Sequence, residues 1–176
     1  FRLYYGKSDW SLCTNAIHVM DLIEWLSNEK IVEVDGSSLD DKIYESKRSG
    51  FIELTGKITG KTSNKGTFEM HAIKNIPYGE VEFEISNQDT RLFVNEEKGE
   101  GILMRRENDW KPEKHGFEIR LQSNRTQEIV QSILETGNCN LPTFKESSNT
   151  HKPLLKTIIK HMNTISNTKY DSCPIT

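Results

Sequence analysis

The sequence has few cysteines, and the three that it has are far apart. Cys13, Cys139 and Cys173 are the complete set among 176 residues. An odd number of widely separated cysteines excludes a framework of disulfide bonds of the kind that holds small secreted domains together. Unpaired thiols are typical of reducing compartments, so we expect an intracellular protein, cytoplasmic or nuclear.

Long apolar runs and an excess of positive charge are also missing. No apolar stretch approaches the roughly 18 residues that a membrane-spanning helix needs, so we expect no membrane association. The chain has 23 Lys and Arg against 26 Asp and Glu, a formal net charge of −3. This balance excludes a polyanion binder that acts through overall charge, although it allows a local basic patch. The chain begins with Phe, which indicates a fragment or a processed protein.

Motifs that carry catalytic or metal chemistry are absent from the sequence. The five histidines are scattered, with no Cys-X-X-Cys pair and no His-Glu-X-X-His segment. No glycine-rich segment has the spacing of a phosphate-binding loop. We therefore expect no bound metal and no cofactor, and this favours a binding protein over an enzyme.

What the sequence does contain is a strand-rich middle, from Phe51 to Leu121. Apolar and polar residues alternate around Ile52–Ile58, Phe68–Ala72, Val81–Ile85 and Phe117–Leu121. Alternation indicates strands with one buried face, which is typical of antiparallel sheets, since parallel sheets are covered on both faces. Turn-forming segments separate the strands, including residues 62–66 and 76–79, and Gly56 indicates a bulge or bend.

Helical patterns flank this middle on both sides. Apolar residues recur at helical spacing over residues 15–28, and Asn124 and Gly137 bound a second helix by their capping preferences. A last helix with an apolar stripe is expected from Pro153 onward. A further short helix is expected between Ser38 and Lys47. We interpret residues 1–137 as a core domain with its strand-rich centre at 51–121, and residues 138–176 as a loop plus a C-terminal helix packed on it.

This order predicts an α+β domain: a mainly antiparallel sheet or small β-barrel packed by three to four helices. Three barrel-like or curled-sheet forms fit the pattern, namely the oligonucleotide-binding barrel, the pleckstrin-like sheet closed by a helix, and the pseudobarrel of some DNA-binding proteins. The resemblance to an oligonucleotide-binding barrel covers residues 51–86.

The functional hypothesis that follows is a non-catalytic nucleic-acid-binding module within a larger protein or assembly. Basic side chains mixed with aromatic ones suit single-stranded or duplex nucleic acid, because phosphates meet the charges and bases stack on the rings. The candidate nucleic-acid-binding residues are Lys57, Lys61, Lys65, Lys74, Arg105, Arg106 and Trp110.

Two alternatives remain open from the sequence. The first is a protein-protein interaction domain of pleckstrin-like type, with another protein as partner. The second is a metal-dependent nuclease in which Asp35, Glu53 and Lys57 are brought together, because such sites need clustered carboxylates for Mg²⁺ and a lysine near the phosphate.

Overall fold

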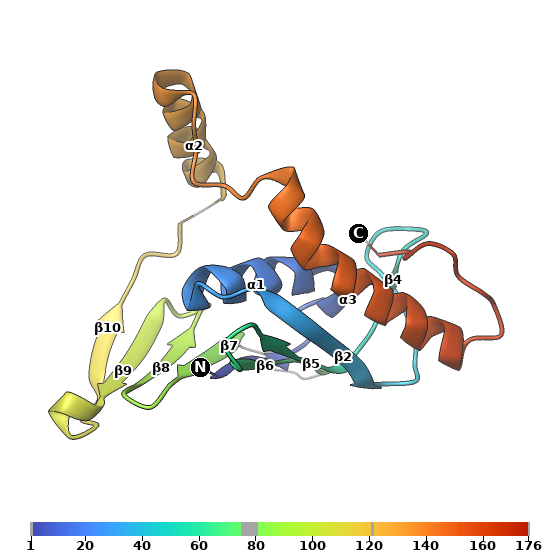
Figure 1. Ribbon diagram of the computed structural model, residues 1–176, viewed down its shortest axis with the longest axis horizontal. Coiled ribbons are helices and arrows are strands. Elements are labelled where there is room, and N and C mark those ends of the chain that lie inside the picture. Colours follow the sequence, from blue (N-terminus) through green and yellow to red (C-terminus); the bar gives the residue numbers. More distant parts are fainter. Residues whose placement is uncertain (1, 75–80, 121, 176) are drawn as a thin grey trace.

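A computed structural model describes residues 2–74, 81–120 and 122–175 (Figure 1). The turn expected at residues 76–79, with Tyr78, lies outside the described residues. Three α-helices are assigned: α1 (Leu12–Ser27), α2 (Gln122–Thr136) and α3 (Phe144–Ile165). The strands are β1 (Arg2–Ser8), β2 (Ile31–Leu39), β3 (Tyr44–Glu45), β4 (Ile52–Glu53), β5 (Gly56–Thr62), β6 (Thr67–Ala72), β7 (Glu82–Ser86), β8 (Thr90–Asn95), β9 (Glu100–Arg105) and β10 (Glu113–Gly116). A 3₁₀ turn, η1 (Arg106–Asn108), follows β9.

Eight of these strands form one open, mixed sheet. Their order is β10-β9-β8-β7-β1-β6-β5-β2, and β3 pairs separately with β4. β1 runs parallel to β6 and antiparallel to β7. The predicted fold class, a mainly antiparallel sheet or small barrel of oligonucleotide-binding, pleckstrin-like or pseudobarrel type, is therefore wrong. The prediction assumed that consecutive strands close on one another, whereas the N-terminal strand inserts between two strands from the middle of the chain.

Gly6 explains in part how the parallel pair fits together. It lies in β1 opposite His71 of β6 with φ 151°, and a Cβ atom at this position would lie 2.1 Å from the backbone oxygen of His71. That separation is far below van der Waals contact, so only glycine allows the two backbones to approach in this way.

One face of the sheet is covered by α1 and α3, and the core lies beneath these helices. α1 buries Leu12, Ala16, Met20 and Ile23 against the sheet. α3 buries Leu154, Ile158 and Met162, and it packs on β2 and α1. The apolar stripe expected for the last helix thus faces the core, although its flanking residues Leu155, Ile159 and Ile165 are only half-buried. The opposite face of the sheet is uncovered in the described structure.

Several local predictions fail for identifiable reasons. Residues 38–47, expected as a helix, complete β2 and form β3. The strand expected at 117–121 lies earlier, at β10, and residues 117–120 belong to no element. The last helix begins at Phe144, because a capping box between Thr143 and Glu146 starts it nine residues before Pro153. Proline is accommodated there inside the helix.

α2 stands apart from the rest of the molecule. Figure 1 shows it projecting clear of the sheet on the side where α1 and α3 lie. None of its described side chains, from Ser123 to Thr136, is buried. In the described ranges, the helices are too short or too polar for any of them to traverse a lipid bilayer.

Candidate functional site

The basic residues selected from the sequence are dispersed, and most are paired with carboxylates. The contacts are Lys57 with Glu69 (3.0 Å), Lys61 with Glu33 (2.8 Å), Lys74 with Asp9 (2.6 Å), Arg105 with Glu113 (3.0 Å) and Arg106 with Asp89 (3.7 Å). Trp110 lies beneath the Arg91 guanidinium, 5.3 Å from the ring centroid. Lys65 occupies the turn between β5 and β6, with φ 66°.

These residues do not converge on one surface. Four strands separate β5, which carries Lys57 and Lys61, from β9, which carries Arg105. The nuclease trio is separated as well. Glu53 is buried beside α1, Asp35 bonds to Ser37 in β2, and Lys57 pairs with Glu69. In the described part of the chain, no group of three or more His, Cys, Asp or Glu side chains is arranged to hold a metal ion.

The start of α1 is built around the buried carboxylate of Glu53. Ser11, the N-cap residue, makes no side-chain capping bond, and the backbone N–H of Cys13 instead donates to Glu53 Oε1 at 2.6 Å. The N–H of Leu54 donates to the same oxygen at 3.2 Å. Burial raises the pKa of Glu53, and the two backbone bonds offset only part of that rise. A carboxylate from β4 therefore occupies the positive end of the α1 dipole.

Beside this helix start lies an aromatic cluster with a second buried acid. The Tyr5 ring meets Trp10 edge-on at 4.9 Å, and the indole N–H of Trp10 donates to the backbone oxygen of His71. The Tyr5 hydroxyl donates to Glu96 at 3.2 Å. Burial is the main cause that raises the pKa of Glu96, and the Tyr5 bond and the Arg125 charge counter it only in part. Burial, followed by the Glu96 charge, also raises the pKa of Tyr5.

α1 exposes two large apolar side chains, Trp25 and Leu26, outside the face that it buries. Ile17 packs against the core instead. Trp25 is 78% exposed. The outward side of α1 therefore has the character of a contact surface.

His18 lies on this outward side of α1, one turn before Leu22. It is exposed, and no described residue forms a hydrogen bond or ion pair with its imidazole. The other histidines differ. His71 lies on the uncovered face of the sheet. His115 lies 3.8 Å from Glu113, His151 lies 3.2 Å from Asp21, and His161 lies 3.1 Å from the backbone oxygen of Asp40. Of the described histidines, His18 and His71 have rings without a hydrogen-bond or ion-pair partner, and His18 is the exposed one and lies on a helix. Histidine is the side chain that most often serves as a general acid or base in enzymes.

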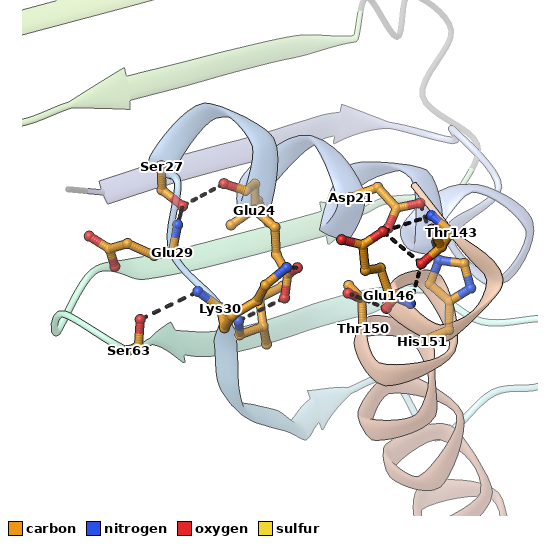
Figure 2. Close-up of polar contacts among 12 residues, drawn as sticks. Asp21, Glu24, Ser27, Glu29, Lys30, Ser63, Thr143, Glu146, Thr150 and His151 are labelled. Carbon is orange, nitrogen blue, oxygen red and sulfur yellow. Dashed lines mark hydrogen bonds and ion pairs between the residues drawn. The ribbon is translucent and has the colours of Figure 1, made fainter. Parts of the chain in front are cut away.

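A polar junction fixes α1 relative to its neighbours (Figure 2). Asp21 of α1 bonds to His151 of α3 at 3.2 Å. Glu24 accepts from the Lys30 ammonium at 2.6 Å and from the backbone N–H of Ile31 at 3.0 Å, which ties the end of α1 to β2. These contacts hold the helix in place and so fix the direction in which His18 and Trp25 point.

The apolar stripe that helical spacing predicts for this helix is Val19, Leu22, Ile23 and Leu26, and of these only Val19 and Ile23 are buried. The observed inward stripe is rotated and runs through Cys13, Ala16 and Met20.

The sequence matches no protein-family model, and no curated protein sequence matches it. Solved structures do share its fold. UDP-N-acetylglucosamine 3-dehydrogenase GnnA from Acidithiobacillus ferrooxidans is 14% identical, with a TM-score of 0.61 over 87% of this chain and 49% of that protein. An NAD-binding oxidoreductase from Klebsiella pneumoniae is 14% identical, with a TM-score of 0.61 over 94% and 57%. An oxidoreductase domain protein from Kribbella flavida is 10% identical, with a TM-score of 0.61 over 88% and 55%.

These neighbours correct the functional hypothesis. A non-catalytic nucleic-acid-binding module is contradicted, because the solved structures with this fold are oxidoreductases and dehydrogenases. The pleckstrin-like and nuclease alternatives, and the preference for a binding protein over an enzyme, are contradicted by the same finding. The nuclear location, which was one of two expected from the unpaired cysteines, receives no support from these neighbours. The chain spans about half the length of the structures it matches.

The described residues do not form a cradle for a dinucleotide. Such a cradle needs a glycine-rich turn between a strand and a helix, with the pyrophosphate at the helix N-terminus. The turn between β1 and α1 contains no glycine, and Gly6 lies inside β1. The N-terminus of α1 already holds the Glu53 carboxylate, whose charge would repel a phosphate.

Proposed function

We propose that this chain is the substrate-side half of a nicotinamide-dependent oxidoreductase. The observation that carries the proposal is the shared fold, which extends over 85% or more of this chain but only about half of each neighbour. The absence of a phosphate cradle supports the assignment to the half that does not hold the dinucleotide. The remaining task for such a half is to bind the substrate and to manage its proton.

His18 is the proton acceptor in this proposal. Removal of a hydride from an alcohol by nicotinamide leaves a hydroxyl proton that a base must accept. His18 is exposed, has no described partner, and points away from the sheet on a helix that the Asp21–His151 contact holds in position. It is therefore placed to reach a substrate on the outward side of α1.

The test is dehydrogenase activity of the natural-length polypeptide that carries this chain. Reduction of NAD⁺ or NADP⁺ is followed with a panel of alcohols that includes free sugars and nucleotide sugars. His18→Asn should lower kcat by about 10²–10⁴-fold, the usual contribution of a positioned acid–base group, with a smaller effect on KM. His115→Asn, at another exposed histidine, is the matched control. No reduction with any alcohol, or equal effects of the two substitutions, would contradict the proposal.

The chain alone offers a second check. Residues 1–176 should show no saturable binding of NADH or NADPH in a fluorescence titration, because the α1 terminus is occupied by Glu53. Tight binding by this chain alone would show that it is the dinucleotide half after all.

A further inference from the structure

The segment from the end of β10 to the first residue of α3 exposes more large apolar side chains than any other part of the described chain. We call residues 117–120 and 122–144 the arm. Its exposed apolar residues are Phe117, Ile119, Val130, Ile133, Leu134, Leu141 and Phe144. Leu134 is 80% exposed and Phe144 is 90% exposed. Exposed apolar groups this numerous in one segment mark a contact surface.

The helix in the arm is well specified by its sequence, yet none of its side chains from Ser123 to Thr136 is buried. The Arg120–Glu128 ion pair at 2.8 Å joins it only to another residue of the arm. Gly137, with φ 73°, ends α2, and its N–H donates to the Ile133 oxygen at 2.9 Å. The hydroxyl of Thr136 donates to the Ser132 oxygen. An isolated helix of about 15 residues is marginal in water, because helices in proteins draw most of their stability from a packed apolar face. The apolar face of α2, with Ile133 and Leu134, has no such packing here.

We infer that the arm is the docking surface for a dinucleotide-binding domain of the same polypeptide, an inference that rests on the proposed function. The neighbours are single chains in which this fold takes up about half of the length. The arm projects on the side of the sheet where α1 lies, so one partner can cover both α2 and the outward side of α1 (Figure 1). That placement would also close the surface around His18.

The charge pattern of α2 argues against a lipid surface as the occupant. Helices that lie on membranes have a polar face rich in Lys and Arg. The polar face of α2 has one basic residue, Arg125, against Glu128 and Glu135, and is otherwise composed of amide and hydroxyl side chains. A largely uncharged polar rim around an apolar stripe is typical of a protein interface.

The test is hydrogen exchange of the α2 backbone amides. In the natural-length polypeptide they should exchange about tenfold or more slowly than in residues 1–176 alone, because packing suppresses local opening. The double variant Ile133→Asp with Leu134→Asp should remove that protection. Asn124→Asp with Gln131→Asp, on the polar side of the same helix, should leave it intact. Both variants should melt like the unmodified protein as isolated chains, which controls for folding.

Other occupants give different results. Concentration-dependent protection of α2 in residues 1–176 alone, with a dimeric mass on sedimentation, would assign the arm to a second copy and overturn the inference. Binding of residues 1–176 to phosphatidylcholine–phosphatidylserine vesicles through Ile133 and Leu134 would overturn it in favour of a membrane. Unprotected α2 in an active natural-length enzyme would refute the docking while the proposed function stands. Protected α2 in a polypeptide that reduces no dinucleotide would refute the function and leave an interdomain contact.

Discussion

α2 and α3 are both amphipathic helices in the last third of the chain, but their apolar faces have opposite surroundings. In α3, Leu154, Ile158 and Met162 are completely buried against the sheet and α1. In α2, Ile133 and Leu134 face solvent. The comparison shows that an apolar stripe predicts that a face will be covered, but not by which part of the protein. The apolar face of α3 is covered within the described chain, whereas that of α2 is not.

The largest expected effect comes from shortening a side chain in the buried apolar stripe of α3. Ile158→Ala should lower the free energy of unfolding of residues 1–176 by about 2–5 kcal/mol, the usual result of removing a large buried side chain and leaving a cavity. Leu134→Ala, the matched change on α2, should stay within about 0.5 kcal/mol because its side chain is already in water. Chemical denaturation of both variants measures the difference. Similar losses would mean that α2 packs on this chain in solution.

The capping carboxylate of α1 should give the next largest effect. Glu53→Ala leaves the N–H groups of Cys13 and Leu54 buried without an acceptor, and an unsatisfied buried group costs about 1–3 kcal/mol. Glu53→Gln keeps an amide oxygen for both donors and should cost less. Equal losses in the two variants would show that the charge, not the hydrogen bonds, holds the helix start.

Glu53 also predicts a pH dependence with a definite sign. Its pKa is raised from 4.5 in the folded protein, so folding favours the protonated form. The corresponding stability is present below pH 4.5 and is lost as pH rises through the raised folded pKa. In Glu53→Gln this component should vanish. Thermal melting of the two proteins from pH 4 to about pH 7 tests it, and parallel curves would count against a raised pKa.

A smaller effect is expected at the start of α3. Thr143→Ala removes the side-chain half of the capping box with Glu146 and should cost about 1 kcal/mol. Lys145→Ala, in the same helical turn and exposed, is the control and should change stability little. Thermal melting compares the two. A neutral Thr143→Ala would indicate that burial alone, without the cap, sets where α3 begins.

The smallest effect is expected on the uncovered face of the sheet. Lys61→Ala breaks the exposed pair with Glu33 and should change the free energy of unfolding by less than about 1 kcal/mol, since both side chains are more than half exposed. Chemical denaturation at low and moderate salt measures it. A larger loss would show that this face contributes to the fold more than its exposure indicates.

The sequence predicted local elements better than their assembly. Alternation around Phe68–Ala72 and Val81–Ile85 corresponds to β6 and β7, because side-chain period reports the strand directly. It does not report the partner strand. Nothing in residues 1–8 indicates that β1 will pair with both β6 and β7, since that choice is made by tertiary contacts. The inference of an antiparallel barrel failed at this step.

The candidate site was out of reach for a related reason. Basic residues such as Lys61 and Arg106 attract notice in a sequence, but each has an acidic partner that only the fold reveals. His18 has no motif around it that distinguishes it from the other four histidines. Only the structure singles it out, because His18 is exposed without a described hydrogen-bond or ion-pair partner on a helix that also exposes Trp25.

The position of β1 in the sheet has a consequence for how the chain is made. β1 is synthesised before both strands that it pairs with, which are Thr67–Ala72 on one side and Glu82–Ser86 on the other. These partners begin 59 and 74 residues after the end of β1. Pairing over such sequence distances slows folding, because the chain loses the entropy of closing a long loop before the strands form any stabilising contact. The nascent chain therefore carries β1 unpaired until β6 has been synthesised, and both edges of β1 are paired only after β7 has followed.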